Sequence, residues 1–539
     1  MNIRPSLLPR LFSPTAASLL LLPLSLCFGC SSSPAGGGAP GPDGPAVSPS
    51  ASLRQGQTDV SVSFTRAAGG LASASGFALG DLTVTANRAK SSDTRLVLAV
   101  SVPHGAALGP RTLSFTDAHG AVSVPAVISV GAITSGPAGQ DTDRGTSDAP
   151  FRTIKRAVQA AGAGDTIQLL DGTYDAGGGE TWGYALPDRL TILGQSIDMT
   201  VIKGPAVAGT SSGGGAGNGL DAGPGLVLKD LSLDDFDQGV NLARPGALTL
   251  DNVRLGDHQS AAVHVDAAAS PATVVLTGAR LAIDSPAAAG VVVDAAGSTL
   301  TVQAGSVSAD HDGLMLGPHC AGCTLDVGAA SVAASAVDGH AVEIAAGATG
   351  SRITFHGATI NGDTLISDGA AIMTVVSSTI NQTVPTTTIN FGGVQLDMKD
   401  STVTVSANTF GINFQQGVLT LSGVTITGGS YCVYQLSGSA KLRGSQIKNY
   451  GYIGYYLAKG DLDLGTQTEA GNNIFSGDAT GPAMFGLYVD EINNPATSSN
   501  TSFNGVVPPA GTRMAGSSPI AEPGEYFINM GKTMTFWTL

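Results

Sequence analysis

Residues 226–233 read Leu-Val-Leu-Lys-Asp-Leu-Ser-Leu, and residues 248–255 read Leu-Thr-Leu-Asp-Asn-Val-Arg-Leu. Apolar and polar residues alternate in both phrases, which is the period of a β-strand and not of a helix. Related phrases recur roughly every 20–28 residues, the spacing of stacked repeat proteins. A strand this short cannot bury its apolar face alone, so successive copies must stack. The further copies are residues 274–281, 300–307, 325–327, 353–360, 373–380, 396–398, 419–426, 442–447 and 462–464.

A second, shorter aliphatic run follows most of these phrases, as in residues 239–242 and 290–293. Because the chain completes a full circuit between copies, corresponding strands are parallel, and such connections are overwhelmingly right-handed. We therefore predict an all-β chain built on a right-handed parallel β-helix of roughly ten turns. Abundant Gly (74 residues) and few aromatics (5%) suit its tight corners and narrow interior. An array of β-sandwiches is the alternative, but the hairpin turns that it needs are scarce.

The most specific stretch of the sequence is residues 141–174. Ile154 and Val158 lie on one face of a predicted short helix, which Thr153 or Asp148 can cap. The first strand of the coil follows directly. Without cover, the first turn would leave apolar residues and strand edges in water, so we expect this helix to cap the coil.

Residues 149–174, with the pattern Ala-Pro-Phe-x-Thr-Ile followed by Gly-Asp-Thr-Ile and Gly-Thr-Tyr, closely resemble the start of pectate-lyase-like β-helix domains. In particular they resemble the bacterial family known as domain of unknown function fifteen-sixty-five, common among surface lipoproteins. Residues 462–466 and 471–475 resemble its closing turns. The resemblance spans residues 133–507 and implies a right-handed parallel β-helix, but it brings no established activity with it.

The start of the chain predicts export. Arg4 and Arg10 precede an apolar run that ends at Cys30, so we read residues 1–29 as a signal peptide. Its end resembles a bacterial lipoprotein signal, which implies lipidation of Cys30. Residues 30–57 predict a flexible tether. We therefore expect a lipoprotein of the outer membrane or cell surface that touches the membrane only through its lipid. The alternative is an ordinary cleaved signal and a periplasmic or secreted protein.

Residues 58–132 predict a small antiparallel β-sandwich, because short stretches of alternating apolar and polar residues are separated by Gly-rich turns. Residues 102–115 resemble the IPT/TIG type of immunoglobulin-like (Ig-like) domain, which implies a spacer or a binding module. The predicted β-helix then occupies residues 133–507. Residues 508–539 are irregular and form a tail or a cap.

Five titratable residues at predicted corners are candidates for catalysis: Asp234, Asp235, Asp310, His311 and Asp312. Paired carboxylates can act as acid and base on a sugar, and a His between carboxylates can be a base or a metal ligand. Related hydrolases carry an Asn-x-Asp block, which does not precede the Asp pair here, and a Gly-His-Gly block, which this sequence lacks. The cations that a lyase needs are scattered. Solvated turns are the alternative for all five.

The sequence offers little for cofactors. Residues 141–148 resemble an oxygen-rich Ca²⁺ loop, but a third acidic ligand and the distal Glu are missing. Cys320 and Cys323 form one Cys-x-x-Cys pair, which is too few ligands for a zinc site and suits a local disulfide in an exported protein. We therefore predict no metal site and no cofactor, with Ca²⁺ as the alternative.

Tyrosines gather near the end of the coil and are candidates for glycan binding, because aromatic rings pack on sugars and their hydroxyls add hydrogen bonds. The alternative is that the last turns need larger core residues. A formal charge of −15 argues against binding to nucleic acid or anionic lipid. The candidate residues are Tyr431, Tyr434, Tyr452, Tyr455 and Tyr456.

The sequence thus predicts a non-enzymatic cell-surface lipoprotein that presents its β-helix for adhesion or glycan binding. Its expected partners are polysaccharide or another cell-surface protein. The alternative is an enzyme, a polysaccharide lyase or glycoside hydrolase of the pectate-lyase-like type.

Overall fold

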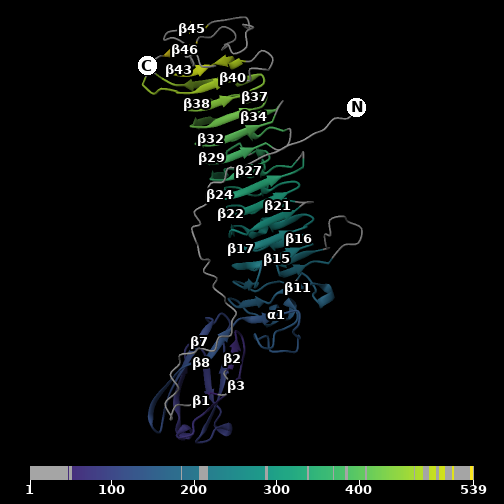
Figure 1. Cartoon of the computed structure of the whole chain (residues 1–539), viewed down its shortest axis with the longest axis vertical. Coiled ribbons are helices and arrows are strands. Elements are labelled where there is room, and N and C mark those ends of the chain that lie inside the picture. Colours follow the sequence, from purple (N-terminus) through teal and green to yellow (C-terminus); the bar gives the residue numbers. More distant parts are fainter. Residues whose placement is uncertain are drawn as a thin grey trace, which may run out of the picture.

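The chain forms an elongated parallel β-solenoid with a smaller β-rich unit at its N-terminal end (Figure 1). The computed structural model describes residues 46–47, 51–183, 185–205, 217–285, 289–336, 339–367, 369–382, 386–406, 409–466, 468–477, 485–492, 497–503, 513–514 and 534–537. The solenoid has about 12 turns, somewhat more than predicted. Within the described residues, no helix has the length and apolar character needed to cross a membrane.

Each full turn of the solenoid adds one strand to each of three parallel sheets, here called the first, second and third faces. In one turn these strands are β26 (Arg352–His356), β27 (Thr359–Asn361) and β28 (Thr364–Ile366). They pair in parallel with β29, β30 and β31 of the next turn. The predicted coil of parallel strands is therefore confirmed.

The strands are grouped by face. The first face contains β9 (Ile133–Ser135), β10 (Thr166–Leu169), β12 (Thr191–Leu193), β19 (Ala272–Thr277), β26, β29 (Ile372–Val376), β32 (Gln395–Lys399), β35 (Val418–Ser422), β38 (Ser439–Arg443), β43 (Thr497–Ser499) and β46 (Met534–Trp537). The strands that continue from the first face into the second are β15 (Leu226–Asp234), β17 (Gly246–Gly256), β22 (Thr299–Ala309) and β24 (Thr324–Ala334). The second face also contains β11 (Gly172–Tyr174), β13 (Thr200–Lys203), β20 (Ala282–Ser285), β27, β30 (Thr379–Asn381), β33 (Thr402–Val405), β36 (Thr425–Gly428), β39 (Gln446–Lys448), β41 (Ile474–Ser476) and β44 (Ser502–Phe503).

The third face matters most for the candidate site. Its strands are β14 (Asn218–Asp221), β16 (Gln238–Leu242), β18 (Ala261–Val265), β21 (Ala289–Val293), β23 (Leu314–Leu316), β25 (Val342–Ile344), β28, β31 (Ile389–Phe391), β34 (Phe410–Phe414), β37 (Tyr431–Gln435), β40 (Ile453–Leu464) and β42 (Phe485–Ile492). β40 continues into the first face of the next turn. A short strand, β45 (Arg513–Met514), pairs antiparallel with β46.

The interior is a set of aliphatic ladders in which each side chain occupies the position of its equivalent one turn away. Leu248, Val274 and Leu300 are consecutive members of one such ladder, and all three are fully buried. Burying one such side chain contributes about 1.5–3 kcal/mol, so stacking supplies the stability that a single turn lacks. Each repeated phrase in the sequence therefore contributes one layer of side chains to a single continuous core.

In most turns, the corner between the first and second faces has one residue in the left-handed region. Asp230, Asn252 and Gly278 take this position in successive turns, with φ of 53°, 53° and 99°. Farther along, Gly357 and Asp400 do the same. Asn, Asp and Gly tolerate this conformation best, which explains why these small polar residues recur between the aliphatic rungs.

A short helix, α1 (Ile154–Ala160), packs against the first turn at β9 and β10, as the sequence predicts. Thr153 is the N-cap, because its Oγ1 accepts a hydrogen bond from the Arg156 backbone N–H at 3.1 Å. The helix ends with Ala161 as its C-cap. Three of its apolar residues belong to the solenoid core, namely Ile154, Ala157 and Val158.

The N-terminal unit has its own core between two four-stranded sheets. One sheet orders β1 (Ala46–Val47), β3 (Val60–Thr65), β6 (Arg95–Ser101) and β5 (Thr83–Ala86). The other orders β2 (Ala51–Arg54), β8 (Gly120–Gly131), β7 (Gly109–Asp117) and β4 (Ser75–Leu79). β1 and β2 lie inside the segment 30–57 predicted as a tether, so this unit begins before residue 58. The predicted signal peptide and Cys30 lie outside the described residues.

The two units contact each other through Asp165, which is fully buried. Its carboxylate accepts a hydrogen bond from the Gly105 backbone N–H at 2.7 Å and pairs with His104 Nδ1 at 2.5 Å. Beside it, the Thr166 backbone N–H donates to Gln55 Oε1 at 2.7 Å. These contacts hold the N-terminal unit against the first turn of the solenoid.

Leu250 tests the ladder model. This fully buried side chain lies between Leu228 and Leu276 of the adjacent turns. Leu250→Ala removes its contacts with both neighbours and leaves a cavity, so we expect the free energy of unfolding in urea to fall by about 2–5 kcal/mol. Thr249→Ala, on the outer side of the same strand, is the control and should change it by about 0.5 kcal/mol or less. Equal losses for the two variants would contradict the ladder model.

Candidate functional site

The third face carries a continuous outer ladder, defined as the solvent-side residues that face each other in register on successive strands. All of its members are half-buried. In order along the solenoid they are Asp221, Asn241, His264, Val292, Met315, Glu343, Leu365, Asn390, Asn413, Tyr434, Tyr456 and Tyr488. Adjacent members approach closely, as in the hydrogen bond from Asn413 Nδ2 to Asn390 Oδ1 at 3.0 Å. Polar and aromatic side chains are thus concentrated on one side of the rod.

The outer ladder ends in a stack of tyrosine rings. Tyr434 and Tyr456 are 4.6 Å apart between ring centroids, with planes 3° from parallel. Tyr488 continues the stack at 5.2 Å and 7°. These spacings approximate the distance between neighbouring strands, so the parallel register of the sheet sets the stack.

A second row of rings flanks this stack. Phe410 and Tyr431 stack at 5.0 Å, and Tyr452 packs edge-on against Tyr431 at 5.6 Å. Tyr452 is the most exposed of these rings, at 42%. The buried Ile453 faces Tyr431 in register from the next turn and packs against it. Partial burial of the Tyr431 hydroxyl raises the pKa of Tyr431. We call the whole group the tyrosine surface: Phe410, Tyr431, Tyr434, Tyr452, Tyr456 and Tyr488.

The tyrosine surface contains four of the five tyrosines that the sequence proposes for glycan binding. The fifth, Tyr455, points into the core, where its hydroxyl donates to Gln435 Oε1 at 2.5 Å. Neighbours on a strand face opposite sides, so Tyr455 and Tyr456 cannot share a surface. Sequence reasoning missed Tyr488 and Phe410, because both lie outside the Tyr-rich run.

Asp234 and Asp235 lie at the end of β15, where a cation engages each carboxylate. Arg254 Nη2 lies 2.7 Å from Asp234 Oδ2, and Lys203 Nζ lies 3.2 Å from Asp235 Oδ2. Burial raises the pKa of the Asp234 carboxyl, although Arg254 opposes the shift. The strand register puts this corner three turns from Asp310, roughly 14 Å away at the usual strand spacing. The structure therefore does not bring the two predicted acidic groups together.

Asp310, His311 and Asp312 occupy the corner between β22 and β23. Asp310 Oδ1 accepts a hydrogen bond from the Ser335 hydroxyl at 2.8 Å, and His311 is exposed. Asp312 Oδ1 accepts from the His340 backbone N–H of the next turn at 3.1 Å. Of the three residues, Asp312 faces the other titratable groups of this corner.

Asp312, His340 and Glu343 form a cluster in which one ligand-type atom from each residue lies within 4.8 Å of the other two. Burial first, and then the Asp312 carboxylate, raise the pKa of Glu343. The pKa of His340 is also raised, chiefly by Asp363, whose Oδ1 lies 2.9 Å from His340 Nδ1. The sequence analysis named only Asp312 from this group. Its partners lie 28 or more residues farther along the chain and become neighbours only when the turns stack.

Cations that a lyase would need as a base are paired with acids near the end of the solenoid. Lys441 Nζ lies 2.9 Å from Glu469 Oε2, and Arg443 Nη2 lies 2.7 Å from Asp463 Oδ2. Hydrogen bonds from Lys441 and Arg443 lower the pKa of Glu469. These cations are therefore engaged in ion pairs.

The loop weighed as a Ca²⁺ site serves the start of α1. The Asp141 carboxylate accepts hydrogen bonds from the backbone N–H groups of Arg152 and Thr153, at 3.0 and 2.9 Å, and from the Thr153 hydroxyl at 2.9 Å. Asp143 Oδ2 accepts from the Gln140 backbone N–H at 3.1 Å. Both carboxylates thus bind the backbone of the turn that leads into the helix.

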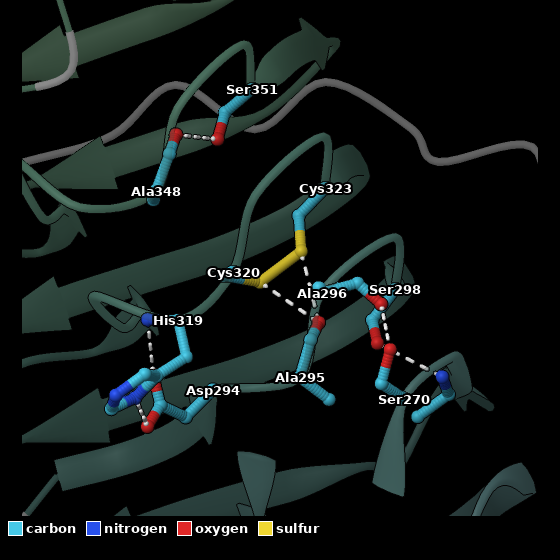
Figure 2. The surroundings of a disulfide bond; sticks show 11 residues. Ser270, Asp294, Ala295, Ala296, Ser298, His319, Cys320, Cys323, Ala348 and Ser351 are labelled. Atoms are coloured by element: carbon cyan, nitrogen blue, oxygen red, sulfur yellow. Dashed lines mark hydrogen bonds and ion pairs between the residues drawn. A yellow bond between two sulfur atoms is a disulfide. The ribbon is translucent and has the colours of Figure 1, made fainter. Parts of the chain in front are cut away.

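Cys320 and Cys323 are joined by a disulfide in a corner of the solenoid (Figure 2). The Ala295 carbonyl oxygen of the preceding turn lies 3.4 and 3.1 Å from the two sulfurs. Beside the disulfide, Asp294 accepts from the His319 backbone N–H at 2.8 Å and pairs with its Nδ1 at 2.6 Å (Figure 2). Cys432 is a buried free thiol, and burial raises its pKa. We read all of these contacts as structural.

Part of the chain matches a known protein family, and the chain is also similar to solved structures. Residues 137–241 match the family described as "Protein of unknown function (DUF1565)". The catalytic unit of the GH87 α-1,3-glucanase from Streptomyces thermodiastaticus strain HF3-3 is 13% identical, with a TM-score of 0.35, over 82% of this chain and 88% of that chain. A rhamnogalacturonan lyase is 12% identical, with a TM-score of 0.28, over 70% and 88%. No curated protein matches the chain. The chain thus contains a DUF1565 domain within a parallel β-solenoid.

His258 is a further titratable group whose pKa is shifted by burial. Its ring is fully buried and stacks on Phe236 at 6.3 Å between centroids. Neither ring nitrogen makes a well-directed hydrogen bond. Burial lowers the pKa of His258 to about 4, although the Phe236 and Leu233 carbonyls partly oppose the shift. The folded chain therefore holds this imidazole neutral at pH values where the unfolded chain protonates it.

This difference predicts a pH-dependent stability. As the pH falls from about 6.5 to 4, His258 becomes protonated in the unfolded chain but stays largely neutral in the folded chain. The free energy of unfolding therefore falls by roughly 3 kcal/mol over this interval. His258→Phe removes this contribution, so its stability should fall less than that of the wild type over the same interval. His264→Phe, on the outer ladder, is the control and should keep the wild-type slope. Urea unfolding at several pH values measures how the free energy of unfolding depends on pH. The same dependence for wild type and His258→Phe would contradict the assignment of this effect to His258.

Proposed function

We propose that this chain is a non-enzymatic surface protein that binds glycan on its tyrosine surface. The stack of Tyr434, Tyr456 and Tyr488, one ring per turn, is the observation that carries the proposal. Aromatic rings bury a large apolar area and also bring a polar group that can hydrogen-bond to sugar hydroxyls. Such rings are therefore suited to a ligand with both apolar and polar faces.

The tyrosine surface is formed before any ligand binds. Five of the six rings extend from hydrogen-bonded strands of the third face, and Tyr452 directly precedes β40. The buried Ile453 packs against Tyr431, Tyr456 and Tyr488. A pre-organised surface loses little side-chain entropy on binding. Rings that stack face to face expose their edges more than their faces, so the surface suits an extended glycan laid along the rod better than a single sugar.

The rest of the proposal concerns placement in the cell. Lipidation at Cys30 would anchor the chain at the outer membrane or cell surface, and an Ig-like N-terminal unit would act as a spacer. A right-handed β-helix would then present its third face to polysaccharide or to another surface protein. The sequence before residue 46 supports the anchor, and the two packed sheets of residues 46–131 support the spacer.

A polysaccharide lyase or glycoside hydrolase is the alternative. The observation that favours it is the carboxyl pair of Glu343 and Asp312, in which Glu343 has a raised pKa. A carboxyl group with a raised pKa beside a second carboxyl group suits acid catalysis on a glycosidic bond. The ion pairs of Lys441 and Arg443 weigh against the lyase form of this alternative.

A glycan array that includes uronic-acid polymers, probed with the full-length protein, tests the proposal. We expect Tyr456→Ala and Tyr434→Ala each to weaken glycan binding at least tenfold, or about 1.4 kcal/mol, because each removes one ring of the stack. Leu365→Ala, three turns away on the same ladder, is the matched control and should bind like the wild type.

Two readouts separate this proposal from its alternatives. Thermal unfolding of each variant shows whether the tyrosines only stabilise the last turns. Unchanged glycan binding by the double variant of Tyr434 and Tyr456 would refute the proposal. Release of unsaturated or reducing products that Glu343→Gln abolishes would favour the enzyme instead.

A further inference from the structure

The Asp312–His340–Glu343 cluster has the make-up of a metal site. The three residues come from two successive turns, Asp312 before β23 and the other two at β25. Their ligand-type atoms all lie within 4.8 Å of one another, and all three residues are half-buried. The cluster therefore opens toward solvent at the edge of the third face, where an ion can enter.

The backbone fixes the two turns that carry these side chains. The Gly313 N–H donates to the His340 carbonyl at 2.9 Å, and the Leu314 N–H donates to the Ala341 carbonyl at 3.0 Å. Asp312 Oδ1 accepts from the His340 backbone N–H at 3.1 Å, and a side-chain hydrogen bond links Asp312 to Glu343. Glu343 thus extends from strand β25, while Asp312 and His340 lie in corners that backbone hydrogen bonds link to each other.

Asp363, one turn farther on, lies behind the imidazole of His340. This residue is only 5% exposed, and its Oδ1 lies 2.9 Å from His340 Nδ1. Their interaction is the main cause of the raised pKa of His340. A carboxylate on one ring nitrogen is the usual partner of a metal-binding His, because it orients the ring and leaves Nε2 for the ion.

The negative charges of the carboxylates at this corner also favour a bound cation. Three carboxylates and one imidazole meet at this corner. Among the described residues, no Lys or Arg side chain forms an ion pair with Asp312, Glu343 or Asp363. Carboxylates gathered this closely repel each other unless a proton or a positive ion lies between them.

We propose that Asp312, His340 and Glu343 bind one divalent transition-metal ion of the zinc class, with Asp363 as the residue that positions His340. The donor set decides the class of ion. Ca²⁺ and Mg²⁺ take oxygen ligands, whereas Zn²⁺ and its neighbours combine imidazole nitrogen with carboxylate oxygen. Three protein ligands leave one coordination position open to water or to a ligand on the third face.

Zn²⁺ titration tests this proposal. Full-length protein without a histidine tag is stripped with a chelator and titrated with ZnCl₂ by calorimetry, and bound metal is counted by mass spectrometry after dialysis. We expect one high-affinity equivalent of Zn²⁺, and we expect a hundredfold excess of Ca²⁺ not to displace it.

Matched variants locate the site. Glu343→Gln and His340→Ala should each weaken Zn²⁺ binding at least tenfold, and Asp363→Asn about 10–100-fold through its effect on His340. His264→Ala, an outer-ladder His three turns away, should bind Zn²⁺ like the wild type. Unfolding temperatures of the metal-free variants verify that they fold, and Zn²⁺ should raise the unfolding temperature of the wild type but not of Glu343→Gln.

Three outcomes would overturn the proposal. The first is the absence of a stoichiometric Zn²⁺ ion in the wild type. The second is equal affinity in wild type, Glu343→Gln and His340→Ala, which would place the ion elsewhere. The third is displacement of Zn²⁺ by Ca²⁺, which would contradict the ion class assigned from the imidazole ligand.

Discussion

The parallel register between turns is the constraint on which this structure depends. Every strand must hydrogen-bond to the equivalent strand of the turn before it, so each interior side chain lies on its counterpart, as Leu248 lies between Leu226 and Val274. Extra residues can be inserted only at corners, where they leave the register unchanged. This is why the repeated phrases keep their alternation while their spacing varies by several residues.

The same register determines what happens on the outside of the rod. A ladder position repeats once per turn, so residues about 20–30 apart in sequence become neighbours at the strand spacing. Met315, Glu343 and Leu365 are adjacent on the third face for this reason alone. The tyrosine stack and the Asp312–His340–Glu343 cluster are both products of this vertical alignment, and neither consists of a compact sequence motif.

The sequence was sufficient to predict the parallel β-solenoid because the interior obeys a simple rule. Alternation identified the strands, and the Thr153 cap and the helix after it were read correctly. The outer ladder obeys no such rule, since a solvent-side residue carries no periodic signal. Tyr488 was therefore missed. Tyr455 was grouped with Tyr456, although neighbouring side chains on a strand face opposite sides and Tyr455 points into the core. The strand at residues 51–54 escaped notice because its Ser and Ala content resembles a linker, and only pairing with β8 makes it a strand.

The solenoid separates the residues that give stability from those available for binding. Leu228 and Leu250 must stay apolar because each contacts the turn on either side, whereas Glu343 and Tyr434 contact mainly their ladder neighbours and the solvent. Four rungs separate Glu343 from Tyr434, roughly 19 Å at the usual strand spacing. Backbone hydrogen bonds fix that separation. Two sites on this face can therefore differ in chemistry without disturbing each other, while a ligand extended along the rod could contact both.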